Sequence, residues 1–118
     1  MKTTLLFLAL FFVTLARGAD ILLTWTDNST TEANFEIERA VQAATPVFAK
    51  IGTVPANTVT FTDTNVPAAT TLLYRVRATN SGGASGYSNT ASILTPIAPP
   101  TAPSGVAATI VISVSFTP

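Results

Sequence analysis

Two glutamates come closest to a catalytic arrangement in this sequence: Glu36 and Glu38, separated by one residue. Residues two apart in a β-strand point to the same face and lie roughly 7 Å from one another, and glycosidases hold their two carboxylates within that range. Phe35 and Ile37 alternate with the glutamates, which places the glutamates on a solvent face, away from any cleft. We therefore expect them to form ion pairs with arginines and not to catalyse hydrolysis.

Nucleophilic and metal chemistry lack their usual residues. The chain contains no His and no Cys, so a serine or threonine nucleophile would need Lys50 as its base, and no motif places one beside it. An oxygen-ligand metal site needs clustered acids, whereas Asp27 and Asp63 are isolated residues in predicted turns. We expect no catalytic residue, no metal and no cofactor.

The first 18 residues have the organisation of a secretory signal. A basic start at Met1–Lys2 is followed by the apolar run Leu5–Leu15 and by the small residues of Ala16–Gly18. The apolar run is shorter than the about 20 residues that a membrane-spanning helix needs. We predict a signal peptide over residues 1–18, cleaved after Gly18 or after Ala16, and a secreted, extracellular product; a retained membrane anchor is the alternative.

The remaining charges exclude one class of partner. The whole chain has six Lys and Arg and six Asp and Glu, and Lys2 and Arg17 fall in the signal segment, which leaves 6 − 2 = 4 basic against six acidic residues. They form no basic cluster for phosphate contacts, so we expect no nucleic-acid partner, and no membrane partner after cleavage. Without cysteine, an exported fold depends on its hydrophobic core and not on disulfides.

Alternating segments after Gly18 predict an all-β domain. In the clearest of them, Thr71–Asn80, apolar even-numbered residues alternate with odd ones that include Arg75 and Arg77. Similar segments lie at residues 21–26, 34–39, 47–51, 58–63 and 87–94. Short strands separated by turn signals indicate a Greek-key sandwich. The predicted core residues share an inward parity: Leu23, Trp25, Phe35, Ile37, Phe61, Leu72, Tyr74 and Val76.

The same alternation predicts how the glutamates are neutralised. If their strand lies antiparallel to Thr71–Asn80, a single register brings Glu36 opposite Arg77 and Glu38 opposite Arg75, because both pairs of residue numbers have the same sum. Cross-strand ion pairs on an exposed face stabilise a sheet by about 0.2–1 kcal/mol each.

Several of these segments resemble a bacterial fibronectin type III module. The resemblance covers about residues 20–95 and is found in Leu23-Thr24-Trp25, Phe35–Arg39, Ile51–Val54, Phe61–Thr64, Tyr74–Asn80 and Gly86–Asn89. It implies an immunoglobulin-like Greek-key sandwich in which Trp25 is the core tryptophan of the second strand. Leu72, however, stands where the family carries a tyrosine whose hydroxyl ties one corner of the sandwich. The predicted cleavage site also directly precedes Ile21, so the module lacks its own first strand.

The C-terminal part divides into a linker and a second segment. Residues 19–95 form the predicted domain, residues 96–103 a proline-rich linker, and residues 104–118 resemble the start of a second, truncated module with Phe116 at its tryptophan position. We consider two fates for Val106–Phe116. It fills the vacant first-strand position beside Ile21–Thr26, in the same molecule or in a second one, or it is the first hairpin of a missing domain.

One loop offers candidate ligand contacts. The glycine-rich stretch Asn80–Gly86 leads into Tyr87, the aromatic residue most expected to be exposed, and we take Tyr87, Ser85 and Asn80 as the candidates. The family resemblance implies a non-catalytic spacer or protein-interaction unit of a larger extracellular or cell-surface protein. The alternative is a carbohydrate-binding accessory module of a secreted hydrolase, which would use exposed aromatic rings.

Overall fold

The computed structural model of this chain describes residues 18–112. The predicted signal segment before Gly18 and the residues from Ser113 onward, which include Phe116, lie outside that range. The strands are β1 Ile21–Thr24, β2 Asn34–Val41, β3 Ala49–Pro55, β4 Thr60–Asp63, β5 Thr71–Asn80, β6 Gly83–Ala84 and β7 Ala91–Leu94. Within residues 18–112, no helix is long and apolar enough to cross a membrane.

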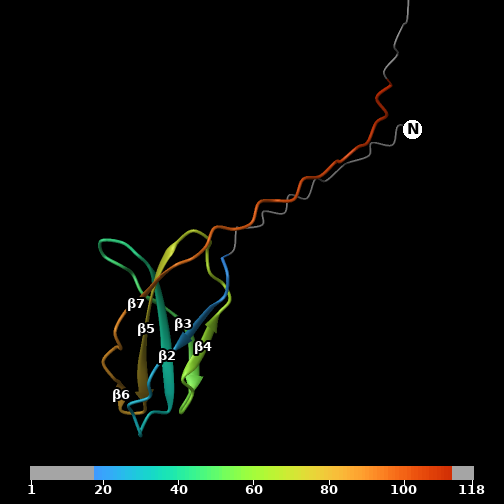
Figure 1. Cartoon of the computed structure of the whole chain (residues 1–118). Helices are drawn as coiled ribbons and strands as arrows, with labels where there is room; N and C mark the ends of the chain where they lie inside the picture. Colours follow the sequence, from blue (N-terminus) through green and yellow to red (C-terminus); the bar gives the residue numbers. More distant parts are fainter. Residues whose placement is uncertain (1–17, 113–118) are drawn as a thin grey trace, which may run out of the picture.

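The strands form two antiparallel sheets that face each other (Figure 1). β1 pairs with β4 in the smaller sheet. In the larger sheet, β2 pairs with β3 on one side and with β5 on the other, and the short strands β6 and β7 both pair with the far edge of β5. An alternating strand such as β5 can pack one face inward and leave the other in water. The predicted all-β sandwich is confirmed.

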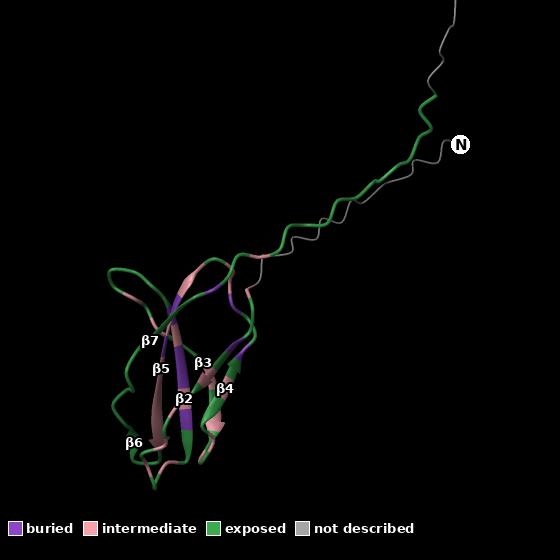
Figure 2. Ribbon diagram, in the orientation of Figure 1, coloured by how far each residue is buried: buried purple, intermediate pink, exposed green. Residues whose placement is uncertain are grey.

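The core is enclosed better under the larger sheet than under the smaller one. Four of the predicted core residues are buried: Phe35, Ile37, Leu72 and Tyr74. The other four are half-buried: Leu23, Trp25, Phe61 and Val76. The buried positions follow β2 and the first half of β5 (purple in Figure 2). Three of the half-buried residues come from β1, the residue after it and β4, so the open side of the core lies at the smaller sheet.

A buried carboxylate, Asp63 on β4, joins the two sheets. It accepts hydrogen bonds from the Tyr74 hydroxyl on β5 and from Arg39 Nη1 on β2, both at 2.8 Å, and it is 5% exposed. Burial and then the contact with Asp63 raise the pKa of Tyr74 well above its usual value. The interpretation of Asp63 as an isolated turn residue is therefore wrong, because the last position of β4 points this side chain between the sheets.

The loop between β4 and β5 is tied by a threonine. Leu72, which stands at the tyrosine position, is completely buried and has no hydroxyl. The hydroxyl that ties the loop comes instead from Thr95, the residue that follows β7, which is 1% exposed. Its hydroxyl accepts a hydrogen bond from Thr70 N at 2.9 Å and donates one to the Pro67 carbonyl at 2.7 Å.

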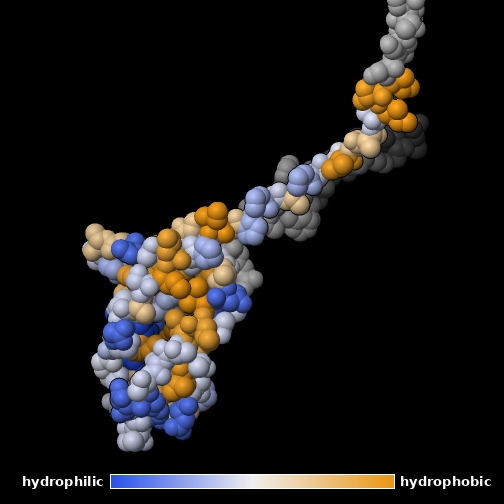
Figure 3. Space-filling view, in the orientation of Figure 1, coloured by the Kyte–Doolittle hydropathy of each residue, from blue (hydrophilic) through white to orange (hydrophobic). Residues whose placement is uncertain are grey.

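Both ends of the sandwich attach to this same loop. Gly18 N donates to the Val66 carbonyl and Ala69 N donates to the Pro96 carbonyl, each at 2.9 Å. From Pro96 the chain runs away from the sandwich without pairing as a strand (Figure 1). Its apolar side chains stay in solvent, with Val106 90% exposed and Ile110 89% exposed, and Figure 3 shows them in orange along the extended segment. Docking of residues 106–112 on their own sandwich is not observed.

Candidate interaction surface

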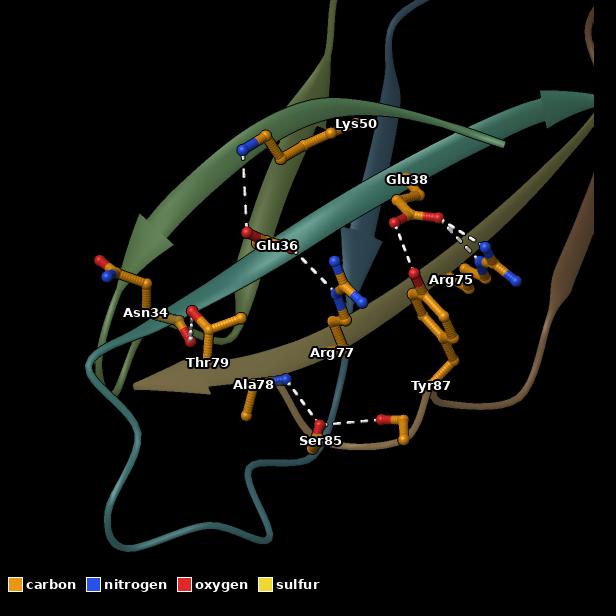
Figure 4. Close-up of polar contacts among 11 residues, drawn as sticks. Asn34, Glu36, Glu38, Lys50, Arg75, Arg77, Ala78, Thr79, Ser85 and Tyr87 are labelled. Atoms are coloured by element: carbon orange, nitrogen blue, oxygen red, sulfur yellow. Dashed lines mark hydrogen bonds and ion pairs between the residues drawn. The ribbon is translucent and has the colours of Figure 1, made fainter. Parts of the chain in front are cut away.

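Charged side chains line the outer face of the larger sheet as two cross-strand pairs (Figure 4). β2 and β5 pair in the register that sets Glu36 opposite Arg77 and Glu38 opposite Arg75. Arg77 Nε donates to Glu36 Oε2 at 2.9 Å, and Arg75 Nη2 donates to Glu38 Oε1 at 2.7 Å. Lys50 Nζ on β3 lies 3.7 Å from Glu36 Oε1. Both predicted ion pairs are confirmed.

Two aromatic rings enclose the pair of Glu38 and Arg75. The Arg75 guanidinium carbon lies 3.6 Å from the ring centroid of Tyr87 and 3.9 Å from that of Phe48. Rings this close can only lie on opposite faces of the planar guanidinium, an arrangement that adds a cation–π attraction. The Tyr87 hydroxyl completes the enclosure by donating to Glu38 Oε2 at 2.8 Å. Glu38 is consequently only 7% exposed, although it lies on the outer face.

The electrostatics of this cluster favour the ionised form of Glu38. Burial by itself raises the pKa of the carboxyl, but the hydrogen bonds from Tyr87 and Arg75 outweigh it, and the pKa lies below its ordinary value of 4.5. The hydrogen bond to Glu38 in turn raises the pKa of Tyr87. A catalytic acid would need the opposite shift. Residues 18–112 also contain no group of three or more acidic side chains that could hold a metal ion.

Serine hydroxyls interrupt the edge strand beside this cluster. Ser85 Oγ accepts from Ala78 N at 2.9 Å, and Ser88 Oγ accepts from Val76 N at 3.0 Å. These hydroxyls occupy the positions that carbonyl oxygens of a continuous strand would take. The strand predicted at residues 87–94 is therefore wrong at its start: the ladder resumes only at Ala91.

The three candidate ligand residues lie along this edge and are each engaged within the chain. Tyr87 is 39% exposed, but Arg75 covers one face of its ring. Ser85 holds the backbone of β5, as described above. The Asn80 side-chain amide donates to the Thr31 carbonyl at 3.1 Å and so joins two loops at the end of the sandwich. No bound ligand tests these three residues, and their role as ligand contacts stays a prediction.

Beside β1, the core of the sandwich is open to solvent. Two adjoining hollows of about 320 and 520 Å³ open between β1 and the chain segment that follows β6. We call them together the open groove; the walls that they share are Trp25, Thr26, Asn28, Val76 and Ser88. The Trp25 ring lies 5.6 Å from the Phe35 ring, yet its buried Nε1 has no hydrogen-bond partner among residues 18–112. Buried donors are normally paired, so this N–H is available to an acceptor that enters the groove.

Comparison with known proteins identifies the type of sandwich. No family model matches the sequence, and no curated protein matches it. Among solved structures, the chain is similar to the twitchin kinase region from C. elegans, described as Fn31-NL-kin-CRD-Ig26, with a TM-score of 0.57 and 18% identity over 70% of this chain. It is also similar to a chain described as a myokine, with a TM-score of 0.51 and 19% identity over 69% of this chain. The fold is an immunoglobulin-like sandwich of the fibronectin type III type.

These similarities extend to the fold alone. The chain spans 15% of the twitchin chain and 86% of the myokine chain, and the kinase belongs to the twitchin protein. β1 is an outermost strand of its sheet, because no other strand of residues 18–112 pairs with its second edge. This agrees with the prediction that the module lacks its own first strand. The sequence signal for the open groove is the short interval between the predicted cleavage site at Gly18 and Trp25.

Proposed function

We propose that this chain is a non-catalytic fibronectin type III-like module of an exported or cell-surface bacterial protein, and that it acts as a protein-interaction unit. The observation that carries the proposal is the position of the two ends of the sandwich. Ile21, the first residue of β1, pairs with Asp63 at the end of β4, and Ala69 N in the loop that follows β4 donates to the Pro96 carbonyl. A domain attached at one end projects sideways from its chain, whereas a spacer adds length only when its ends lie at opposite poles.

The outer face supports an interaction role without chemistry. Each of its carboxylates is paired with an arginine, so neither Glu36 nor Glu38 is available as a general acid or base. The face nevertheless presents a mixed set of groups, with Lys50 and Tyr87 reaching solvent beside the buried pair. Tyrosine and arginine are enriched where proteins bind one another.

The arrangement of the aromatic rings does not support the carbohydrate-binding alternative. Such a module would need two exposed, coplanar rings, whereas Phe48 and Tyr87 are stacked on opposite faces of Arg75. We expect no retention of the wild-type chain on cellulose, chitin or peptidoglycan columns. Retention that is lost in Tyr87→Ala, with the melting temperature preserved, would favour the carbohydrate-binding function instead.

The side-projecting geometry can be measured in solution. In a chain with Ala19→Cys and Ile97→Cys, spin labels should lie roughly 10–20 Å apart, because both positions adjoin the same loop and sheets pack about 10 Å apart. An in-line spacer would separate them by at least the length of the 10-residue strand β5, about 33 Å. A distance in that longer range contradicts the proposed role.

Export is tested separately. Expression of the whole chain in a bacterial host should yield a periplasmic protein whose mass corresponds to an N-terminus at Ala19 or at Arg17. A product that keeps Met1 and fractionates with the membrane would show the retained anchor instead.

A further inference from the structure

The free edge of β1 lacks the usual protection of an exposed strand. Trp25 N donates to the Val59 carbonyl, in line with the register that pairs Ile21 with Asp63 and Leu23 with Phe61. Hydrogen bonding alternates along an antiparallel pair, so the backbone groups of the residues between these face the second edge. Native edge strands are commonly guarded by charges, prolines or bulges. Residues 21–26 contain no charge and no proline.

The apolar wall of the open groove continues from this edge. The groove is bounded on one side by Leu23 and Trp25 and on the other by Val76 of β5. All three side chains are half-buried and face the space that one further strand would cover. A strand added to β1 would satisfy the free backbone groups and close the core in one step.

The chain itself carries a segment that matches this site. In Val106–Ile112, alternate positions 106, 108, 110 and 112 are all apolar and the segment has no charge. Its large side chains are 79–90% exposed: Val106, Ile110, Val111 and Ile112. One face of such a strand would enter the groove, and Leu22, which is 65% exposed on the outer side of β1, would neighbour the other face.

The linker directs this segment away from its own sandwich. Pro99, Pro100 and Pro103 follow the exit at Pro96, and proline fixes φ in the range of the extended polyproline conformation. The nine residues between Pro96 and Val106 span roughly 28 Å in that form. Because Ile21 and Pro96 lie at the same pole of the sandwich, two copies that face each other with these poles can each reach the β1 edge of the other.

We propose that Val106–Ile112 of a second copy of this chain adds to the free edge of β1 and covers the open groove, so that two chains exchange these segments. Neither residues 21–26 nor Val106–Ile112 carry a charge, so the two paired strands themselves bring no charge into the contact. Arg77 and Tyr87 of the outer face also line the groove, but the proposed contact uses none of the ion pairs of that face, so a monomeric wild type would leave the proposed function intact.

The test measures the oligomeric state of the full chain by sedimentation velocity between about 1 and 100 µM. We expect a wild-type dimer. The variant Ile110→Lys/Ile112→Lys, which charges the groove face, should raise the dissociation constant at least a hundredfold, whereas Thr109→Lys/Val111→Lys, which charges the opposite face, should raise it less than tenfold. A monomeric wild type, or a dimer that survives Ile110→Lys/Ile112→Lys, overturns the proposal.

Cysteine pairs locate the contact, since the native chain has no cysteine. One copy carries Leu22→Cys, and the other carries Cys at position 107, 109 or 111 to sample the register. Oxidation of the mixture should link one copy to the other for at least one of these positions. In the double variant Leu22→Cys/Val111→Cys, disulfide formation within a monomer would show that the segment folds back on its own sandwich, and the two-copy contact would then be wrong.

Discussion

The outer face of the larger sheet and the free edge of β1 both combine aromatic rings with polar groups, but only the first satisfies them within the described chain. On the outer face, Glu38 receives partners from β5 and from the segment after β6, and both of its oxygens accept hydrogen bonds. At the β1 edge, the Trp25 indole lies half-buried and its N–H lacks an acceptor.

The difference shows which polar groups side chains can satisfy and which need another strand. An ion pair on a sheet face needs only two residues in register and a ring to cover them, and loops can supply the ring. An open strand edge exposes a row of backbone groups that side chains cannot cover, and it requires another strand. We therefore expect substitutions on the outer face to have small effects on stability. The stability of the β1 edge should depend instead on the segment that occupies the open groove.

The largest effect on stability is expected where the two sheets are joined. Asp63→Ala leaves the Tyr74 hydroxyl without its acceptor between the sheets. It also removes the carboxylate partner of Arg39, which keeps only the Asn65 carbonyl. Loss of one partner of a buried, charged contact costs about 3–5 kcal/mol, and we expect a loss near 3 kcal/mol in the free energy of unfolding, measured with urea. Thr62→Ala, at the exposed neighbouring position of β4, should change it by less than about 0.5 kcal/mol. Equal losses in both variants would contradict a role for Asp63 in joining the sheets.

The second effect concerns the open groove. Complete burial makes a Trp→Ala change cost about 3–5 kcal/mol; Trp25 is half-buried, so Trp25→Ala should cost about 2 kcal/mol in thermal unfolding. Trp25→Phe keeps the packing on Phe35 and should cost less than half as much. A loss of less than about 0.5 kcal/mol in Trp25→Ala would mean that the β1 side contributes little to the core.

The third effect tests the outer face through pH. Glu38→Gln replaces a charged acceptor of Tyr87 and Arg75 by a neutral one, and we expect a loss of about 1–2 kcal/mol at pH 7. Since the pKa of Glu38 is lower in the folded protein, the unfolded chain takes up the proton first as the pH falls. The advantage of the wild type over Glu38→Gln is thus complete above about pH 4.5 and disappears as the pH falls through the lowered pKa. A difference that stays constant from pH 7 to pH 3 would contradict this assignment.

The smallest effect should come from the rim of the same face. Lys50 is 56% exposed in its side chain and lies 3.7 Å from Glu36, a geometry in which an ion pair contributes about 0–0.5 kcal/mol. Lys50→Ala should therefore leave the urea midpoint nearly unchanged, and added salt should remove what difference remains. A loss above 1 kcal/mol would show that the outer face is a more tightly coupled network than its exposure suggests.

The sequence by itself determined the sandwich and the ladder of its outer face. Both are consequences of the period-two alternation, because a strand turns every second side chain to the same side. Given two antiparallel strands, the numbers of Glu36, Glu38, Arg75 and Arg77 allow one register that pairs all four charges. The apolar character of Val106–Ile112 can also be read directly from the sequence.

Only the tertiary structure decided how loops and strand ends complete these elements. Tyr87 and Phe48 approach Arg75 from segments 39 residues apart in sequence, 87 − 48, and no local pattern predicts that meeting. Asp63 looks like a turn residue until β4 is placed against Tyr74 and Arg39. Thr95 has its partners only because the loop at Thr70 lies beside it. The physical reason is range: alternation is a property of neighbouring residues, whereas burial and hydrogen-bond partners depend on which distant segments share the same space.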